Sequence, residues 1–118
     1  MKLRLQTNSL RLRLTRPEVE RLHAGGIVEE VLAFADGATF SYRLQSRLQS
    51  APPEAVCSHA SMTVYLSRED AERWATSEEV GLYGASGGVA IAIEKDFRCL
   101  VPRPGEAESG AYPHPGKS

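Results

Sequence analysis

A chain of 118 residues with 42% hydrophobic and 25% charged residues can bury one core, and this composition excludes a wholly disordered protein. The net charge of −1 excludes a protein that coats nucleic acid or anionic membrane over its whole surface. The charge is uneven, because residues 1–50 hold eight Lys and Arg against five Asp and Glu, whereas residues 51–118 hold six against ten. A basic part and an acidic part can each select a partner.

The N-terminal stretch "MKLRLQTNSLRLRL" has arginines where a signal peptide needs an apolar run, and no stretch approaches the ~20 apolar residues of a membrane-spanning helix. Two cysteines, Cys57 and Cys99, are too few for a disulfide scaffold. We therefore expect a cytoplasmic protein with no membrane partner.

The first half of the chain predicts two strands, a helix and a hairpin. Leucines alternate with Lys, Arg or Gln over residues 2–6 and 10–14, which is typical of half-buried strands, and a Thr-Asn-Ser turn separates them. Thr15 and Glu18 form a capping-box pattern for a short helix that ends at Gly25-Gly26. An Asp36-Gly37 turn between two strand-like runs then indicates a hairpin.

The second half repeats this order. "MTVYL" predicts a strand, Ser67 and Asp70 begin a helix, Trp74 takes the place of Leu22, and a turn within residues 84–88 joins two more strands. "LTRPEVERL" matches "LSREDAERW", and "EEV" follows each helix. This self-similarity indicates duplication of one unit. We expect a single domain over residues 1–101, with units at about 2–45 and 56–96, followed by a flexible Pro- and Gly-rich tail at 102–118.

The series "QTNSLRLRLTRPEVERL" and "VEEVLAFADGATFSYRL" resembles the AbrB/MazE swapped-hairpin family of bacterial DNA-binding proteins. The resemblance implies a β-rich α+β fold in which two units, related by an approximate twofold axis, interlock into one barrel. The protein would then be a monomeric pseudo-dimer or a homodimer. The alternative fold is an open sheet with both helices on one face. Over its full length the chain also resembles a family of short bacterial proteins of unknown function, through "NSLRLRL" and "EKDFRCLVPR".

The AbrB/MazE resemblance implies a non-enzymatic DNA-binding regulator or antitoxin-like protein. Leu3, Leu5, Leu10, Leu12 and Leu14 would line the barrel, and basic side chains would stand outside it. The residues expected to contact nucleic acid or an acidic protein are Lys2, Arg4, Asn8, Ser9, Arg11 and Arg13. In the second unit Thr63 and Tyr65 replace the two arginines of the strand, so only one half offers a basic surface.

Other interpretations of the same residues remain open. The arginines also suit an ordinary solvated sheet surface, or a module that binds an acidic protein. A small-molecule or metal site is a further alternative, with Cys57, His59, Glu94, Asp96 and Cys99 as ligands and His114 in the tail. The spacing matches no standard zinc pattern, and a buried free thiol suits Cys99 better. No nucleophile and base stand at a recognisable spacing, so we expect no catalytic site and no cofactor.

Overall fold

The computed structural model describes residues 1–97, so the expected tail, Cys99 and His114 lie outside the described residues. The described chain runs through eight strands and two helices, in the order strand, strand, helix, strand, strand, twice over. The first unit comprises β1 (Lys2–Gln6), β2 (Ser9–Leu14), α1 (Arg16–His23), β3 (Val28–Ala33) and β4 (Thr39–Arg47). The second unit comprises β5 (Glu54–Ser58), β6 (Ser61–Ser67), α2 (Arg68–Thr76), β7 (Gly81–Ser86) and β8 (Val89–Lys95).

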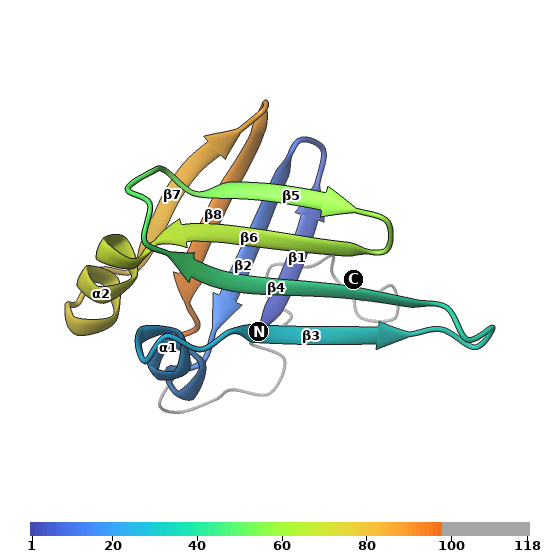
Figure 1. Cartoon of the computed structure of the whole chain (residues 1–118), viewed down its shortest axis with the longest axis horizontal. Coiled ribbons are helices and arrows are strands. Elements are labelled where there is room, and N and C mark those ends of the chain that lie inside the picture. Colours follow the sequence, from blue (N-terminus) through green and yellow to red (C-terminus); the bar gives the residue numbers. More distant parts are fainter. Residues whose placement is uncertain (98–118) are drawn as a thin grey trace, which may run out of the picture.

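The eight strands form two four-stranded mixed sheets. Sheet A has the order β1-β2-β8-β7, and sheet B has the order β3-β4-β6-β5. The strands of the two sheets cross each other, and both helices lie at one end (Figure 1). Each sheet combines the first hairpin of one unit with the second hairpin of the other, through parallel pairing of β2 with β8 and of β4 with β6. The two units therefore complete each other's sheets.

The expected barrel is wrong, because the two sheets do not close on each other. Within residues 1–97 no ladder joins sheet A to sheet B. The strands of the two sheets cross (Figure 1), so their edge strands do not run side by side as a ladder requires. At one edge, β5 begins directly after Pro52 and Pro53, two residues that have no backbone N–H to donate. The β7 edge meets that proline pair through side-chain packing, since a Cβ at Gly84 would lie 2.9 Å from Cδ of Pro53. The arrangement is closer to the open-sheet alternative, with two sheets in place of one.

The repeated "EEV" tripeptides are not equivalent in the structure. In the first unit Glu29–Val31 lies inside β3, whereas in the second unit residues 78–80 precede β7. The ladder register makes Val28 and Leu82 equivalent, because Val28 pairs with Leu44 and Leu82 pairs with Ile93 in matching places of the two sheets. Both side chains are buried, so the pairing and the core, and not the letters, set the correspondence.

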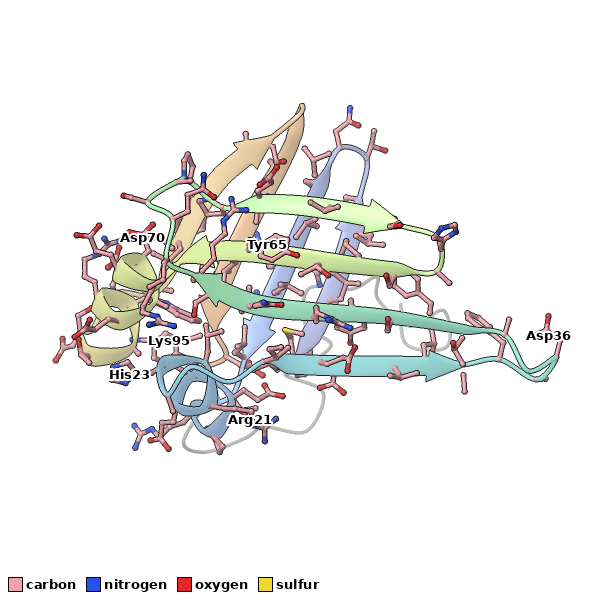
Figure 2. The ribbon with its side chains drawn as sticks, in the orientation of Figure 1. Arg21, His23, Asp36, Tyr65, Asp70 and Lys95 are labelled. Carbon is pink, nitrogen blue, oxygen red and sulfur yellow. The ribbon has the colours of Figure 1, made fainter. Side chains whose placement is uncertain are left out.

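Local signals in the sequence are confirmed at the helix starts and at the hairpins. Ser67 Oγ accepts a hydrogen bond of 3.0 Å from the N–H of Asp70. The N–H of Thr15 donates to Glu18 Oε1 at 2.9 Å, as a capping box requires. Gly37, with a φ of 91°, forms the turn between β3 and β4, and Figure 2 shows the neighbouring Asp36 at the tip of this hairpin.

The core is built from the inward side of both sheets and from the facing sides of the helices. Leu10, Leu12 and Leu14 are buried on β2, as the alternation predicts, and Trp74 and Leu22 are both fully enclosed where the helices pack. Trp74 Nε1 donates to the carbonyl of Val80 at 3.0 Å, so its one polar atom is satisfied. Leu5, in contrast, is 59% exposed and lines no core. It lies next to the turn on the edge strand β1, where only one strand flanks it.

The amino group of Met1 connects three elements. It binds Glu18 on α1 and, at 2.9 Å, Glu30 on β3, while the hydroxyl of Tyr42 on β4 donates to the Met1 carbonyl at 3.1 Å. Burial by itself lowers the pKa of this amine, but the two glutamates outweigh burial and raise the pKa. The start of β1 is thereby fixed to the helix and to sheet B. Neither helix within residues 1–97 is long and apolar enough to cross a bilayer.

Two leucines on the same side of the first hairpin predict different responses to truncation, because Leu12 is buried and Leu5 is exposed. Leu12→Ala removes methyl groups from a fully buried position and should lower the free energy of unfolding by about 2–5 kcal/mol. Leu5→Ala is the matched control, because Leu5 is exposed, and it should cost less than about 1 kcal/mol. Urea unfolding of both variants measures the difference. Equal costs would contradict the inward placement of Leu12.

The position of Glu18 predicts that the stability of the fold decreases at acidic pH. Burial raises its pKa, but hydrogen bonds from the Met1 amine and from Thr15 outweigh burial, so the pKa is lowered from its usual 4.5. A carboxyl group of this kind stabilises the fold above its unfolded pKa, and the contribution is lost as the pH falls through the folded pKa. Glu18→Gln should therefore destabilise at neutral pH and lose less stability than wild type below about pH 4.5.

Urea unfolding at several pH values tests this expectation. Glu20→Gln, at an exposed position on the same helix, is the control and should follow the wild-type pH profile. An unchanged profile for Glu18→Gln would contradict the role assigned to Glu18.

Candidate functional site

The outward side of sheet A gathers the basic residues predicted from the sequence. The antiparallel register places Arg4 beside Arg11, and Lys2 beside Arg13. These four side chains alternate with the leucines, so they point away from the core. We call this surface, defined by Lys2, Arg4, Arg11 and Arg13, the basic face. The other two predicted contact residues lie at its end: Asn8 in the turn and Ser9 at the start of β2.

Asn8 has a structural role that the sequence did not reveal. Its φ of 58° is a left-handed conformation, which Asn tolerates better than most residues. Its carbonyl accepts a hydrogen bond of 2.9 Å from the N–H of Ala90, at the start of the β2–β8 pairing. Asn8 therefore shapes the turn and helps to join the two units.

Strands β8 and β7 extend the basic face with residues from the second unit. In register with Arg13 and Arg11 on β2 lie Glu94 and Ala92 on β8. Beyond Ala92, on β7, lies Tyr83, which is 60% exposed. One row across the sheet thus reads Arg4, Arg11, Ala92 and Tyr83, with a small residue between the aromatic ring and the two guanidinium groups.

Glu94 is the central acceptor of this surface. Its Oε1 atom lies 3.5 Å from Nε of Arg11 and 3.7 Å from Nε of Arg13, and its Oε2 accepts a hydrogen bond of 2.8 Å from the hydroxyl of Tyr83. Lys2 Nζ lies 3.4 Å from Asp96. Arg4 makes no ion pair with any residue in the part of the chain that the structure describes.

The Tyr83 hydroxyl is held over a glycine. A Cβ at Gly81 would lie 2.7 Å from the Tyr83 hydroxyl oxygen and 2.9 Å from Cγ of Glu94, so only glycine leaves room for this contact. The hydrogen bond to Glu94 raises the pKa of Tyr83, with burial and the Glu94 charge adding to it and the Arg11 charge opposing it. The phenol therefore stays protonated and acts as a donor at neutral pH.

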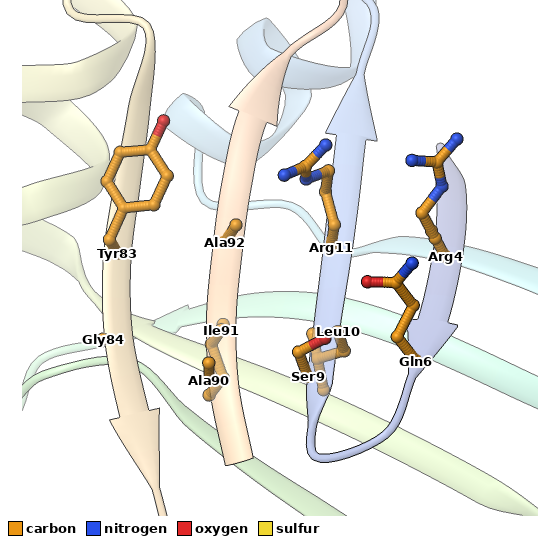
Figure 3. Close-up of a pocket in the computed structure, with 10 residues that line it drawn as sticks. All are labelled: Arg4, Gln6, Ser9, Leu10, Arg11, Tyr83, Gly84, Ala90, Ile91 and Ala92. Carbon is orange, nitrogen blue, oxygen red and sulfur yellow. The ribbon is translucent and has the colours of Figure 1, made fainter. Parts of the chain in front are cut away.

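A shallow hollow of about 290 Å³ lies between Tyr83 and the arginines. Figure 3 shows Ala90 and Ala92 on its floor, with Tyr83 on one side and Arg11, Arg4 and Gln6 on the other. Ser9 borders one end. A flat floor of alanines between a phenol ring and guanidinium planes suits a planar or anionic group.

The outward side of sheet B lacks such a surface. Its arginines are paired: Arg43 with Glu29 at 2.9 Å, and Arg47 with Glu54 at 2.8 Å. The Arg47 guanidinium also lies 4.9 Å from the ring centre of Tyr65, which Figure 2 places on β6. Charge on this side is balanced, so the asymmetry between the two sheets agrees with the replacement of Arg11 and Arg13 by Thr63 and Tyr65.

The residues considered for a metal site do not converge in the described structure. Cys57 is exposed on β5, and His59 lies in the turn after it with a φ of 54°. Glu94 and Asp96 are on the opposite sheet and its end, where they contact Arg11, Arg13 and Lys2. Within residues 1–97 no three His, Cys, Asp or Glu side chains lie close enough to share a metal ion.

Sequence reasoning missed Tyr83 and misjudged Glu94. Tyr83 was overlooked because nothing in "GLYG" indicates that this hairpin pairs with the first strands of the chain. The sequence offers Glu94 as a candidate metal ligand, whereas the structure places it between two arginines and a tyrosine. The sequence signal that could have revealed this site is the pair of small residues at alternate positions, Ala90 and Ala92. Small side chains leave that side of the strand uncovered.

Comparison with protein families gives one match, to a family of unknown function (DUF7009), over residues 1–116. The chain belongs to this family. The expected likeness to short proteins of unknown function is thus confirmed at the level of an uncharacterised family. No curated protein and no solved structure matches the chain. The resemblance to AbrB/MazE proteins is not confirmed by these comparisons.

Proposed function

We propose that this member of DUF7009 is a non-enzymatic binding module that holds DNA through the basic face of sheet A. The observation that carries the proposal is the pairing of Arg4 with Arg11 on adjacent strands, beside a hollow and without an acidic partner for Arg4 among residues 1–97. Arginine forks suit phosphate oxygens because they are always charged and donate two parallel hydrogen bonds.

The electrostatics of this surface support an anionic partner. Lys2, Arg4, Arg11 and Arg13 outnumber the two acidic groups near them, Glu94 and Asp96, although the whole chain carries a net charge of −1. The side chains of Arg11 and Arg13 are 40% and 45% exposed, so their outer nitrogens remain available to a ligand. A local excess of positive charge attracts phosphate even when the net charge is slightly negative.

The same face suits an acidic protein, which is the competing proposal. Only one sheet presents the basic face, so either partner would meet one surface and not two symmetric ones. DNA is favoured because a nucleotide carries a flat base next to its phosphate, which matches the alanine floor and the exposed Tyr83 ring next to the arginines.

Removal of the central arginine pair tests the proposal. Arg4→Ala with Arg11→Ala should weaken binding to labelled DNA and reduce the slope of log affinity against log salt by about 2, since two phosphate contacts are lost. Stability should change by less than about 1 kcal/mol, because exposed charges contribute little. Fluorescence anisotropy with a random duplex and its separate strands, at about 50 and 200 mM salt, measures both quantities.

Arg43→Ala with Arg68→Ala is the charge-matched control. Arg43 lies on the outward side of sheet B and Arg68 is exposed at the start of α2, both away from the basic face. This variant should bind as wild type does. Absence of DNA binding by wild type at the lowest salt would overturn the proposal, and binding of a poly-glutamate peptide at that salt would then favour the acidic protein.

Neutralisation of Glu94 should raise the affinity for DNA, whereas removal of the arginines should lower it. Glu94→Gln keeps an acceptor for the Tyr83 hydroxyl while it removes the charge that competes with phosphate for Arg11 and Arg13. DNA affinity should therefore rise at low salt, and the gain should shrink at high salt because it is electrostatic. A loss of affinity with the fold intact would show that Glu94 itself takes part in binding.

A further inference from the structure

We propose that the hollow between Tyr83 and Arg11 accepts a single unpaired nucleotide, with its base over Ala92 against the Tyr83 ring and its phosphate on Arg4 and Arg11. This proposal rests on the proposed DNA-binding function and adds the class of ligand, which is single-stranded nucleic acid. It follows from the shape of the outward side of sheet A, where the side chains between the ring and the arginines are small.

The first argument is the placement of the ring. Tyr83 is 60% exposed, so much of its ring is open to a ligand. The hydrogen bond to Glu94 Oε2, at 2.8 Å, anchors the hydroxyl, and the absence of a Cβ at Gly81 leaves room for that contact. The ring is thus held in place before any ligand arrives, so little side-chain freedom is lost when a base stacks on it.

The second argument is the floor. Ala92 lies directly between Arg11 and Tyr83 in the strand register, and Ala90 lies two residues away on the same face of the strand. A larger residue at either position would fill the hollow. The volume of about 290 Å³ is close to the lower limit of ~300–1,000 Å³ for small-molecule sites, so it has room for one small planar group.

The third argument is the distribution of polar groups. Tyr83 on β7 and Arg11 on β2 are separated by one strand, β8, so their backbones lie about 10 Å apart. Arg4 lies one strand further, on β1. Aromatic contact and positive charge therefore sit at opposite sides of the hollow, as the base and the phosphate do in a nucleotide. Gln6 and Ser9 border it and can donate to base edges or to sugar oxygens.

The fourth argument concerns duplex DNA. A base inside a duplex is stacked on both faces and paired at its edge, so it cannot lie in the hollow unless it is turned out of the helix. A single strand has no such cost, and stacking on an aromatic side chain is tolerant of sequence. The hollow should therefore favour single strands, whereas the arginines alone would not distinguish them from duplex.

Two variants test the hollow without a change of charge. Tyr83→Ala removes the ring, and Ala92→Leu fills the floor. Each should weaken binding of a labelled oligothymidylate by about 5- to 150-fold, the range expected for loss of one stacked base. Tyr83→Phe is the matched control, because it keeps the ring, and it should retain most of the affinity. Binding of heparin, a polyanion without bases, should stay the same in all three variants.

Competition with a mononucleotide shows whether the ligand is a free nucleotide or a single strand. If only the oligomer binds well, the ligand is a single strand, as proposed; if thymidine monophosphate alone competes with the oligomer at similar concentration, the ligand is a free nucleotide and the assignment to single-stranded nucleic acid is overturned. Unchanged oligomer binding in both Tyr83→Ala and Ala92→Leu, with binding still lost in Arg4→Ala with Arg11→Ala, would overturn the nucleotide site and leave the proposed function intact. No nucleic-acid binding by wild type would overturn both.

Discussion

The parallel pairing of β2 with β8 is the constraint on which the surface of this protein depends. Its ladder joins residues about 80 positions apart in the sequence and sets their register one by one, from Ser9 with Ala90 to Leu14 with Lys95. This register puts Glu94 beside Arg13 and puts a small residue, Ala92, beside Arg11. A shift by one residue would turn Glu94 toward the core and Ile93 toward solvent, so the buried isoleucines fix the charge pattern of the opposite side.

The charges on sheet A are partly satisfied within the protein, and this arrangement explains how four cations can lie together. Glu94 approaches two arginines and a tyrosine at once, and Asp96 approaches Lys2, so repulsion within the group is reduced at one side of the face. Arg4 makes no ion pair among residues 1–97, whereas Lys2 on the same edge strand lies near Asp96. The positive charge without a carboxylate partner is therefore at Arg4, and an anion would meet it there first.

The sequence predicted those features that depend on neighbours along the chain. The alternation in "SLRLRL", the caps at Thr15 and Ser67 and the turn at Gly37 each follow from local backbone chemistry, and the structure confirms them. The features it did not predict depend on which strands pair across the two units. Leu5 is exposed because β1 is an edge strand, the barrel stays open because the strands of the two sheets cross, and Tyr83 joins the arginines through two intervening ladders. No short-range pattern encodes such pairings.

The exchange of hairpins between the units also affects how the fold is assembled. Neither half of the chain can build a four-stranded sheet by itself, since each sheet takes one hairpin from residues 2–47 and one from residues 54–95. The segment between β4 and β5 keeps the two halves at a high effective concentration, so they find each other without a second molecule. The β2–β8 ladder joins residues 81 positions apart, whereas the β4–β6 ladder joins residues 20 positions apart. The β2–β8 ladder therefore closes a long loop, and the chain loses this entropy before the contacts of the ladder compensate for it. We expect such a chain to fold slowly and all at once, with the intervening segment acting as the tether that decides whether the halves meet within one molecule or between two.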